Sequence, residues 1–146
     1  MTPEQAEDLR YFTAAEIERT GARLQDVQLE LMQALDSLRH ELGRRIKLLK
    51  NGMTTGKHSS REHPEGRAVD FTLDNRDGPI TQDTLYLIFT LGIRLGFRGF
   101  GYYFNGKTWS FHLDLRSGCD IWTGRKKAPG KGAWIYKRMS IGFPAH

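Results

Sequence analysis

The chain has 146 residues with a formal net charge of +5, and its content of 38% hydrophobic and 27% charged residues is ordinary for a globular protein. This length predicts a single domain, residues 1–146, that buries a hydrophobic core. No apolar run approaches the roughly 20 residues needed to span a bilayer, and the acidic, polar start lacks a signal-peptide pattern, so we expect no membrane association. Cys119 is the one cysteine, which excludes an intramolecular disulfide and a cysteine-rich zinc site.

The first 21 residues are predicted to contain one short helix. We expect residues 1–10 to form a frayed or weakly helical arm. Thr13 and Glu16 have the spacing of a capping box, in which each side chain accepts a hydrogen bond from the other residue's backbone N–H. A helix should therefore follow Thr13 and stop near Gly21.

A longer helix is predicted from about Leu24 to Leu42. Apolar residues recur there at every third or fourth position, as on the core-facing side of a helix. This apolar stripe consists of Val27, Leu31, Leu35, Leu38 and Leu42. Gly43 is a natural C-cap, and residues 46–49 are typical of a short strand.

A histidine and an aspartate lie seven residues apart where a polar loop, residues 51–65, leads into a predicted strand, Ala68 to Leu73. His63 belongs to the loop and Asp70 to the strand. An unpaired buried carboxylate is costly, so Asp70 needs a cation, a metal or several hydrogen-bond donors. Imidazole and carboxylate are ligands that suit zinc.

A third helix is predicted after a turn-rich connection, residues 74–80. Thr81 or Asp83 can cap its N-terminus, and Gly96 ends it. Its apolar face consists of Leu85, Ile88, Leu91 and Leu95.

A hairpin is predicted around Asn105-Gly106, which separates two apolar and aromatic runs, residues 99–104 and 107–115. Alternation along the second strand places His112 and Asp114 on one face and the apolar residues on the other. That strand can therefore present His112 to a cleft.

These residues together predict a zinc site formed by His63, Asp70 and His112, with water in the fourth position. Three protein ligands and one open position are typical of catalytic zinc. Each ligand also has an ordinary alternative. His63 can be a surface residue of the loop, His112 can be a strand residue whose hydrogen bonds are made within the protein, and Asp70 can form a salt bridge with Arg67 or Arg116.

Other polar residues near this site suggest catalytic roles. Asp114 is a candidate proton acceptor or a hydrogen-bond partner of His112, and Glu62 and Glu65 are the other nearby carboxylates. Cations in the same stretch can bind a substrate carboxylate or steady an oxyanion. They are Lys57, His58 and Arg67.

The C-terminal extension, residues 118–146, is basic. From Arg116 onward seven cations face the single acid Asp120; they are Arg116, Arg125, Lys126, Lys127, Lys131, Lys137 and Arg138. Such a face can meet nucleic acid or the polyanions of a cell envelope, or it can be a solvated surface. Its tryptophans and tyrosine are compatible with an added edge strand.

Two motifs carry a resemblance to a known family. The first, His63-Pro64-Glu65-Gly66-Arg67-Ala68-Val69-Asp70, fits His-x-x-Gly-x-Ala-x-Asp. The second, Gly99-Phe100-Gly101-Tyr102-Tyr103 followed by Phe111-His112-Leu113-Asp114-Leu115-Arg116, fits Gly-Ile-Gly-x-Tyr and His-x-Asp-x-Arg. With segments 12–16 and 35–43 they resemble the zinc D-Ala-D-Ala carboxypeptidases and phage endolysin-type peptidases of peptidase family M15, especially its small phage-like branch.

The resemblance implies an α+β fold of the hedgehog and DD-peptidase type, with helices packed on a small antiparallel sheet. It also implies Zn2+ on His63, Asp70 and His112, and hydrolysis of a peptide bond in the stem or cross-link of peptidoglycan.

Three positions depart from the family pattern. Better-known members have a serine at the position of Arg61, and many have the acidic general base at the position of Trp109. The arginine that binds the substrate carboxylate is missing from the upstream loop, where Lys57 can replace it. We therefore assign the general base to Asp114.

The sequence thus predicts a monomeric zinc metallopeptidase that acts on peptidoglycan, as an endolysin or a carboxypeptidase. We expect synthesis in the cytoplasm and action on the cell wall after holin-type release. Two alternatives stay open. One is a catalytically inactive domain of this family that serves as a phage structural or wall-binding module. The other is a nucleic-acid-binding protein, which leaves the spacing of His63 and Asp70 unexplained.

Overall fold

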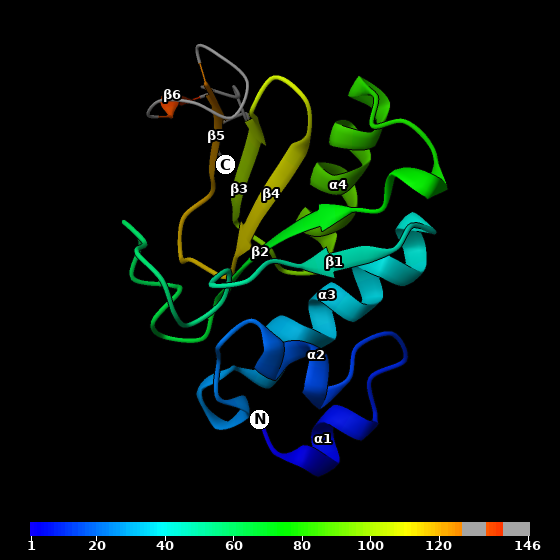
Figure 1. The fold of residues 1–146 in the computed structure, drawn as a ribbon, viewed down its shortest axis with the longest axis vertical. Helices are drawn as coiled ribbons and strands as arrows, with labels where there is room; N and C mark the ends of the chain where they lie inside the picture. Colours follow the sequence, from blue (N-terminus) through cyan, green and yellow to red (C-terminus); the bar gives the residue numbers. More distant parts are fainter. Residues whose placement is uncertain (127–133, 139–146) are drawn as a thin grey trace.

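A sheet of six strands forms the centre of the structure, a computed structural model that describes residues 1–126 and 134–138. The strands are β1 (Ile46–Leu48), β2 (Ala68–Leu73), β3 (Gly99–Phe104), β4 (Trp109–Asp114), β5 (Asp120–Arg125) and β6 (Ile135–Arg138). Their order is β1-β2-β4-β3-β5-β6 (Figure 1). The α+β class is confirmed, but the sheet is mixed rather than wholly antiparallel, because β3 and β5 run parallel.

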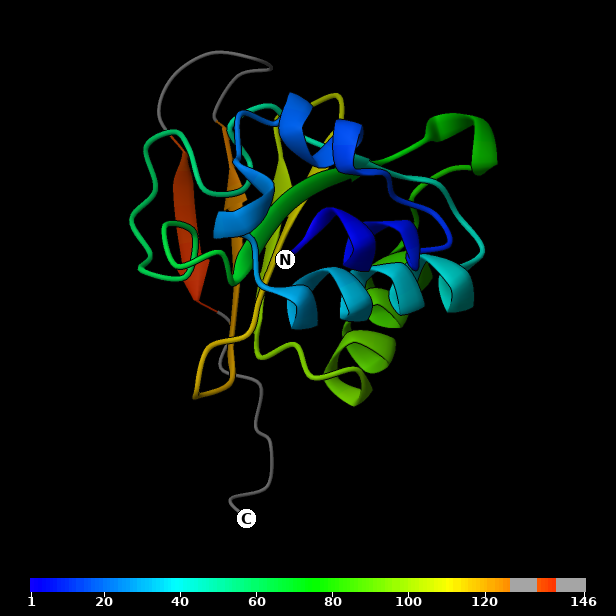
Figure 2. The ribbon, with the colours of Figure 1, turned by 90° about the horizontal axis from the view of Figure 1, so that it is seen from below.

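Helices α3 (Leu29–Leu42) and α4 (Gln82–Arg94) cover one face of this sheet. Helices α1 (Pro3–Glu7) and α2 (Ala14–Arg19) lie beyond its β1 edge (Figure 1). Two 3-10 turns, η1 (Leu24–Asp26) and η2 (Asn75–Asp77), complete the helical elements of the described residues. Figure 2 shows α3 and α4 on one side, whereas the loop between β1 and β2 lies with β6 on the other. Among the described residues, no helix combines the length and apolarity needed to cross a membrane.

The N-terminal residues are packed and contain helix α1, so the predicted arm is helical rather than frayed. The charged amino group of Met1 donates hydrogen bonds to the carbonyls of Leu24 and Val27, at 3.1 and 2.6 Å. Ala6 in α1 is buried against the core. These contacts are long-range and leave no local pattern. The capping box of α2 at Thr13 is confirmed.

Helix α3 begins at Leu29, five residues later than the apolar spacing predicts. The chain before it is extended at Val27 and Gln28, and the Gln28 N–H donates to the carbonyl of Gly66 at 3.0 Å. The helix thus starts later because Gln28 is extended and bonded to the loop that carries His63. The predicted C-cap at Gly43 is confirmed, with a φ of 68°.

The predicted elements of the second half are largely confirmed. Thr81 caps α4, although Ile88 alone of its predicted apolar face is fully buried. The side chain of Asn105 closes the β3–β4 turn by accepting hydrogen bonds from the backbone N–H groups of Lys107 and Thr108. The extension contributes β5 and β6, whereas Lys127 and Lys131 lie outside the described residues.

Gly66 in the first motif allows the ligand loop to pack against η1. Its φ is +73°, and a Cβ at this position would lie 1.9 Å from the carbonyl oxygen of Asp26. Replacement by alanine therefore adds a backbone clash to the cost of left-handed geometry.

We expect Gly66→Ala to lower the free energy of unfolding by about 3 kcal/mol or more. Gly43→Ala is the matched control, because Gly43 has a similar φ of +68° and nothing within 4 Å of its added Cβ; it should cost about 1 kcal/mol. Urea unfolding of both variants measures the difference. Equal losses would contradict the packing role of Gly66.

Candidate metal site and cleft

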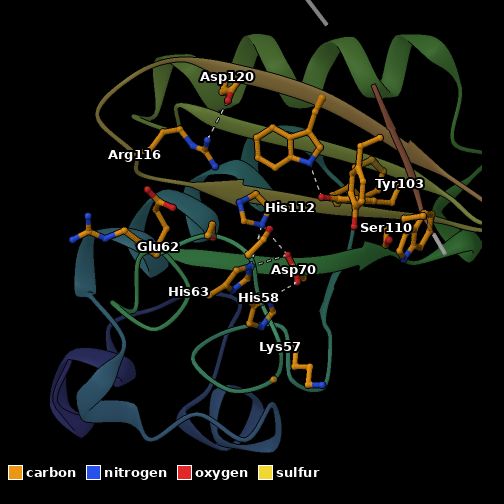
Figure 3. Close-up of a pocket in the computed structure, with 18 of the residues that line it drawn as sticks. Lys57, His58, Glu62, His63, Asp70, Tyr103, Ser110, His112, Arg116 and Asp120 are labelled. Atoms are coloured by element: carbon orange, nitrogen blue, oxygen red, sulfur yellow. Dashed lines mark hydrogen bonds and ion pairs between the residues drawn. The ribbon is translucent and has the colours of Figure 1, made fainter. Parts of the chain in front are cut away.

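The pairing of β2 with β4 places two of the predicted ligands side by side. Asp70 and His112 are directly opposite each other in this antiparallel pair, and opposite residues project to the same face of a sheet. His63 reaches them from the loop before β2 (Figure 3). A hydrogen bond from the Asp70 N–H to the Gly52 carbonyl, at 2.7 Å, ties that loop to β2.

Three side-chain atoms converge at this point. His63 Nε2 lies 3.1 Å from His112 Nδ1 and 3.3 Å from Asp70 Oδ1, and His112 Nδ1 lies 3.0 Å from Asp70 Oδ1. Both imidazoles are buried, whereas the Asp70 side chain is 27% exposed. The structure therefore brings all three predicted ligands together, with access from one side.

Hydrogen bonds on the far sides of the rings orient both histidines. His63 Nδ1 lies 2.7 Å from the carbonyl of Met53, which can only accept, so Nδ1 carries the proton and Nε2 offers a lone pair. His112 Nε2 donates to Asp114 Oδ2 at 2.6 Å, which leaves Nδ1 toward the centre. Metal-binding histidines commonly have such partners.

The triangle formed by these atoms fits tetrahedral zinc. Zinc bonds of about 2.0–2.1 Å place neighbouring ligand atoms about 3.3 Å apart, close to the three distances observed. A proton on His112 Nδ1 satisfies the same atoms when no metal is bound. A positive charge, proton or metal, is therefore required where the three atoms meet.

The neighbouring charges shift the titration of this group. Burial alone would raise the pKa of Asp70, but hydrogen bonds from His112 and His63 lower this pKa to about 2. Burial likewise disfavours charged His112, yet its hydrogen bonds to Asp114 and Asp70 raise its pKa above the ordinary value. Protons and zinc thus compete for His112 Nδ1.

A third histidine lies beside the ligands. The ring of His58 stacks on that of His63 with 3.5 Å between centroids, and its Nδ1 is 3.9 Å from Asp70 Oδ2. Together with His63 and Asp70 it forms a second possible metal-binding group. Its Nε2 contacts the carbonyls of Asn51 and Thr55, so the proton resides on Nε2 and Nδ1 is unprotonated in the neutral ring.

The position of Asp114 does not fit the predicted role of proton acceptor. Its side chain is fully buried and lies behind His112, on the side away from His63 and Asp70. Arg116 donates to it from both Nε and Nη2. Burial raises the pKa of Asp114, but these hydrogen bonds outweigh it and hold the pKa well below its usual range. Asp114 instead orients His112, the other role that the sequence allowed.

The second motif has a steric explanation at the same place. A Cβ on Gly99 would lie 2.2 Å from Asp114 Oδ1, and one on Gly101 would lie 2.8 Å from the ring of Trp122. The hydroxyl of Tyr103 accepts a hydrogen bond from Trp122 Nε1. The motif thus leaves room for the partner of His112 and for one wall of the cleft.

The ligands open into a cleft of about 1300 Å3. Two of the polar residues that the sequence places near the site, Lys57 and Glu62, line this cleft, but Arg67 does not. Arg67 donates to the carbonyl of Leu115 and lines a separate pocket, so the structure does not bring it to the candidate site. Glu65 does not line the cleft; it pairs at 3.9 Å with Arg61, which does.

Trp109 occupies the other face of β4. It is partly buried against the core and packs on Phe104 with 5.0 Å between ring centroids. Residues three apart on a regular strand face opposite sides, so an acid at position 109 would point away from His112.

The sequence analysis did not predict that Tyr103, Trp122 and Asp120 line the cleft beside the ligands.

No protein-family model matches the chain, and no curated protein or solved structure shows significant similarity to it. The resemblance in the two motifs therefore stays a prediction.

We expect the protein to bind about one zinc ion per chain. His63→Ala and His112→Ala should each weaken zinc binding by more than about 100-fold. Zinc affinity should also fall as the pH drops, because the raised pKa of His112 lets a proton compete for Nδ1 at a higher pH than for an ordinary histidine. Competition with a chromophoric chelator measures these affinities, with His40→Ala as the control at an exposed histidine.

His58→Ala separates the two possible ligand sets. Zinc affinity within about threefold of the wild type assigns the ion to His63, Asp70 and His112. A loss as large as that of His63→Ala would assign it to the group that contains His58.

Proposed function

We propose that the protein is a zinc-dependent peptidase that hydrolyses peptide bonds of bacterial peptidoglycan, of the endolysin or D-Ala-D-Ala carboxypeptidase type. The convergence of His63 Nε2, Asp70 Oδ1 and His112 Nδ1 within 3.0–3.3 Å of one another is the observation that carries the proposal. Its opening into a cleft favours a catalytic role for the metal over a structural one. The two motifs supply the expected substrate.

When bound, zinc acts as a Lewis acid that would polarise a peptide carbonyl and lower the pKa of water. The residues of the chain must then hold the substrate and accept a proton. Lys57 is exposed and lines the cleft, so we assign to its ammonium group the binding of a carboxylate of the peptide. Arg116 also lines the cleft, but its guanidinium already pairs with Asp114 and Asp120.

We infer that His58 accepts the proton that the attacking water gives up. Two backbone carbonyls hold its Nε2–H, and its unprotonated Nδ1 faces the Asp70 carboxylate across 3.9 Å. A ring fixed through one nitrogen with the other free beside the reacting centre is the arrangement that a general base requires. Glu62, which also lines the cleft, is the second candidate.

We expect the zinc-loaded protein to release soluble peptides from purified peptidoglycan, and His63→Ala to release none. His58→Ala should lower kcat by about 10²–10⁴-fold with zinc still bound, and Glu62→Gln should have a smaller effect. A chelator should abolish activity, and added zinc should restore it. Mass spectrometry of the products measures turnover and identifies the bond that is cut.

Other outcomes have distinct meanings. A larger loss with Glu62→Gln than with His58→Ala would move the proton acceptor to Glu62. Wild-type protein that binds zinc yet leaves peptidoglycan and its stem peptides intact would contradict the peptidase proposal, and would favour the inactive phage structural or wall-binding module.

A further inference from the structure

One wall of the cleft is aromatic and is supplied by the sheet beyond the metal ligands. Tyr103 on β3, Trp122 on β5, and Trp134 and Tyr136 at β6 all line the cleft. We call these four residues the aromatic wall. In Figure 3, Tyr103 and Lys57 lie on opposite sides of Asp70, so the wall and the ligand loop flank the candidate metal site.

The rings of the wall are ordered by contacts among themselves. The ring of Tyr103 lies 5.3 Å from Trp134 and 6.1 Å from Tyr136, at interplanar angles of 73° and 86°. Trp122 Nε1 donates to the Tyr103 hydroxyl at 2.5 Å. Edge-to-face contacts of this kind hold aromatic rings in fixed relative orientations. Tyr136 is nevertheless 63% exposed, so its ring is available to a ligand.

The two arginines beside the wall are already paired with carboxylates, which favours a neutral ligand over a polyanion. Asp120 accepts from Arg138 at 2.7 Å and from Arg116 at 3.3 Å, and Arg116 also binds Asp114 at 2.6 Å. A phosphate backbone would therefore meet arginines that already have carboxylate partners. Nucleic-acid binding depends on cations that are free to neutralise phosphates.

Sugar rings match a surface of this composition. The faces of aromatic rings carry partial negative charge, and the C–H groups on a pyranose face carry partial positive charge. The cleft volume of about 1300 Å3 exceeds the roughly 300–1,000 Å3 of small-molecule pockets, so it suits a segment of a polymer.

We propose that the aromatic wall binds sugar rings of the neutral glycan strand to which the stem peptide of peptidoglycan is attached. The choice of this polysaccharide rests on the proposed function. The wall then holds the strand while the peptide branch lies toward His63, Asp70 and His112.

The test uses a soluble chitin oligosaccharide, a neutral polymer of N-acetylglucosamine that stands in for the peptide-free glycan strand, in calorimetric titrations of the full chain. Wild type should bind, and Tyr136→Ala should weaken binding at least tenfold. Tyr136→Phe should bind as wild type does, because it keeps the ring. Tyr86→Ala is the matched control, since Tyr86 is 68% exposed on α4 and lies outside the cleft lining.

His63→Ala separates this proposal from the proposed function. It should retain wild-type affinity for the glycan although it lacks a metal ligand and releases no peptide. Glycan binding by a wild-type protein that hydrolyses no peptide would support the wall and contradict the peptidase. Absence of glycan binding by the wild type, or unchanged binding by Tyr136→Ala, would overturn the proposal. Salt-sensitive binding of single-stranded DNA that Tyr136→Ala abolishes, without glycan binding, would overturn it too and assign the wall to nucleic acid.

Discussion

The register between β2 and β4 is the constraint on which the candidate site depends. Asp70 stands opposite His112 in this pair, and a slip of one residue would turn one of the two side chains to the other face of the sheet. Val69 and Leu113, the next pair along, are both buried in the core. The hydrophobic core therefore fixes the register, and through it the distance between two of the three candidate ligands.

Charge balance around the two histidines explains why a cation belongs at the centre. Asp70 and Asp114 are ionised because the pKa of each lies below its ordinary value, and Arg116 neutralises one of these two charges. One negative charge remains among largely buried groups, where an unpaired charge is costly. A proton on His112 compensates it in the metal-free chain, and zinc can take the place of that proton.

Local patterns predicted much of the fold and the ligand set. The capping box at Thr13, the Thr81 cap, the Gly43 C-cap, the Asn105-Gly106 turn and β2 are encoded by residues close in sequence, which is why the predictions hold there. The late start of α3 and the packed N-terminus depend on hydrogen bonds between residues more than 20 positions apart. No periodicity in the sequence reports such contacts.

The roles of single polar residues were harder to predict than the ligands. Alternation along β4 correctly placed Asp114 on the face of His112, but it cannot show whether a residue lies in front of an imidazole or behind it. Arg67 is close to both motifs in sequence, yet its side chain turns to the Leu115 carbonyl. Tyr103 belongs to the second motif, and that position was a signal for the aromatic wall.

The most direct test of the central claim is a crystal structure of the zinc-soaked protein, with anomalous data collected at the zinc edge. The account predicts one strong anomalous peak within about 2.0–2.2 Å of His63 Nε2, Asp70 Oδ1 and His112 Nδ1. Absence of a peak at these atoms, or a peak coordinated by His58 in place of His112, would contradict it.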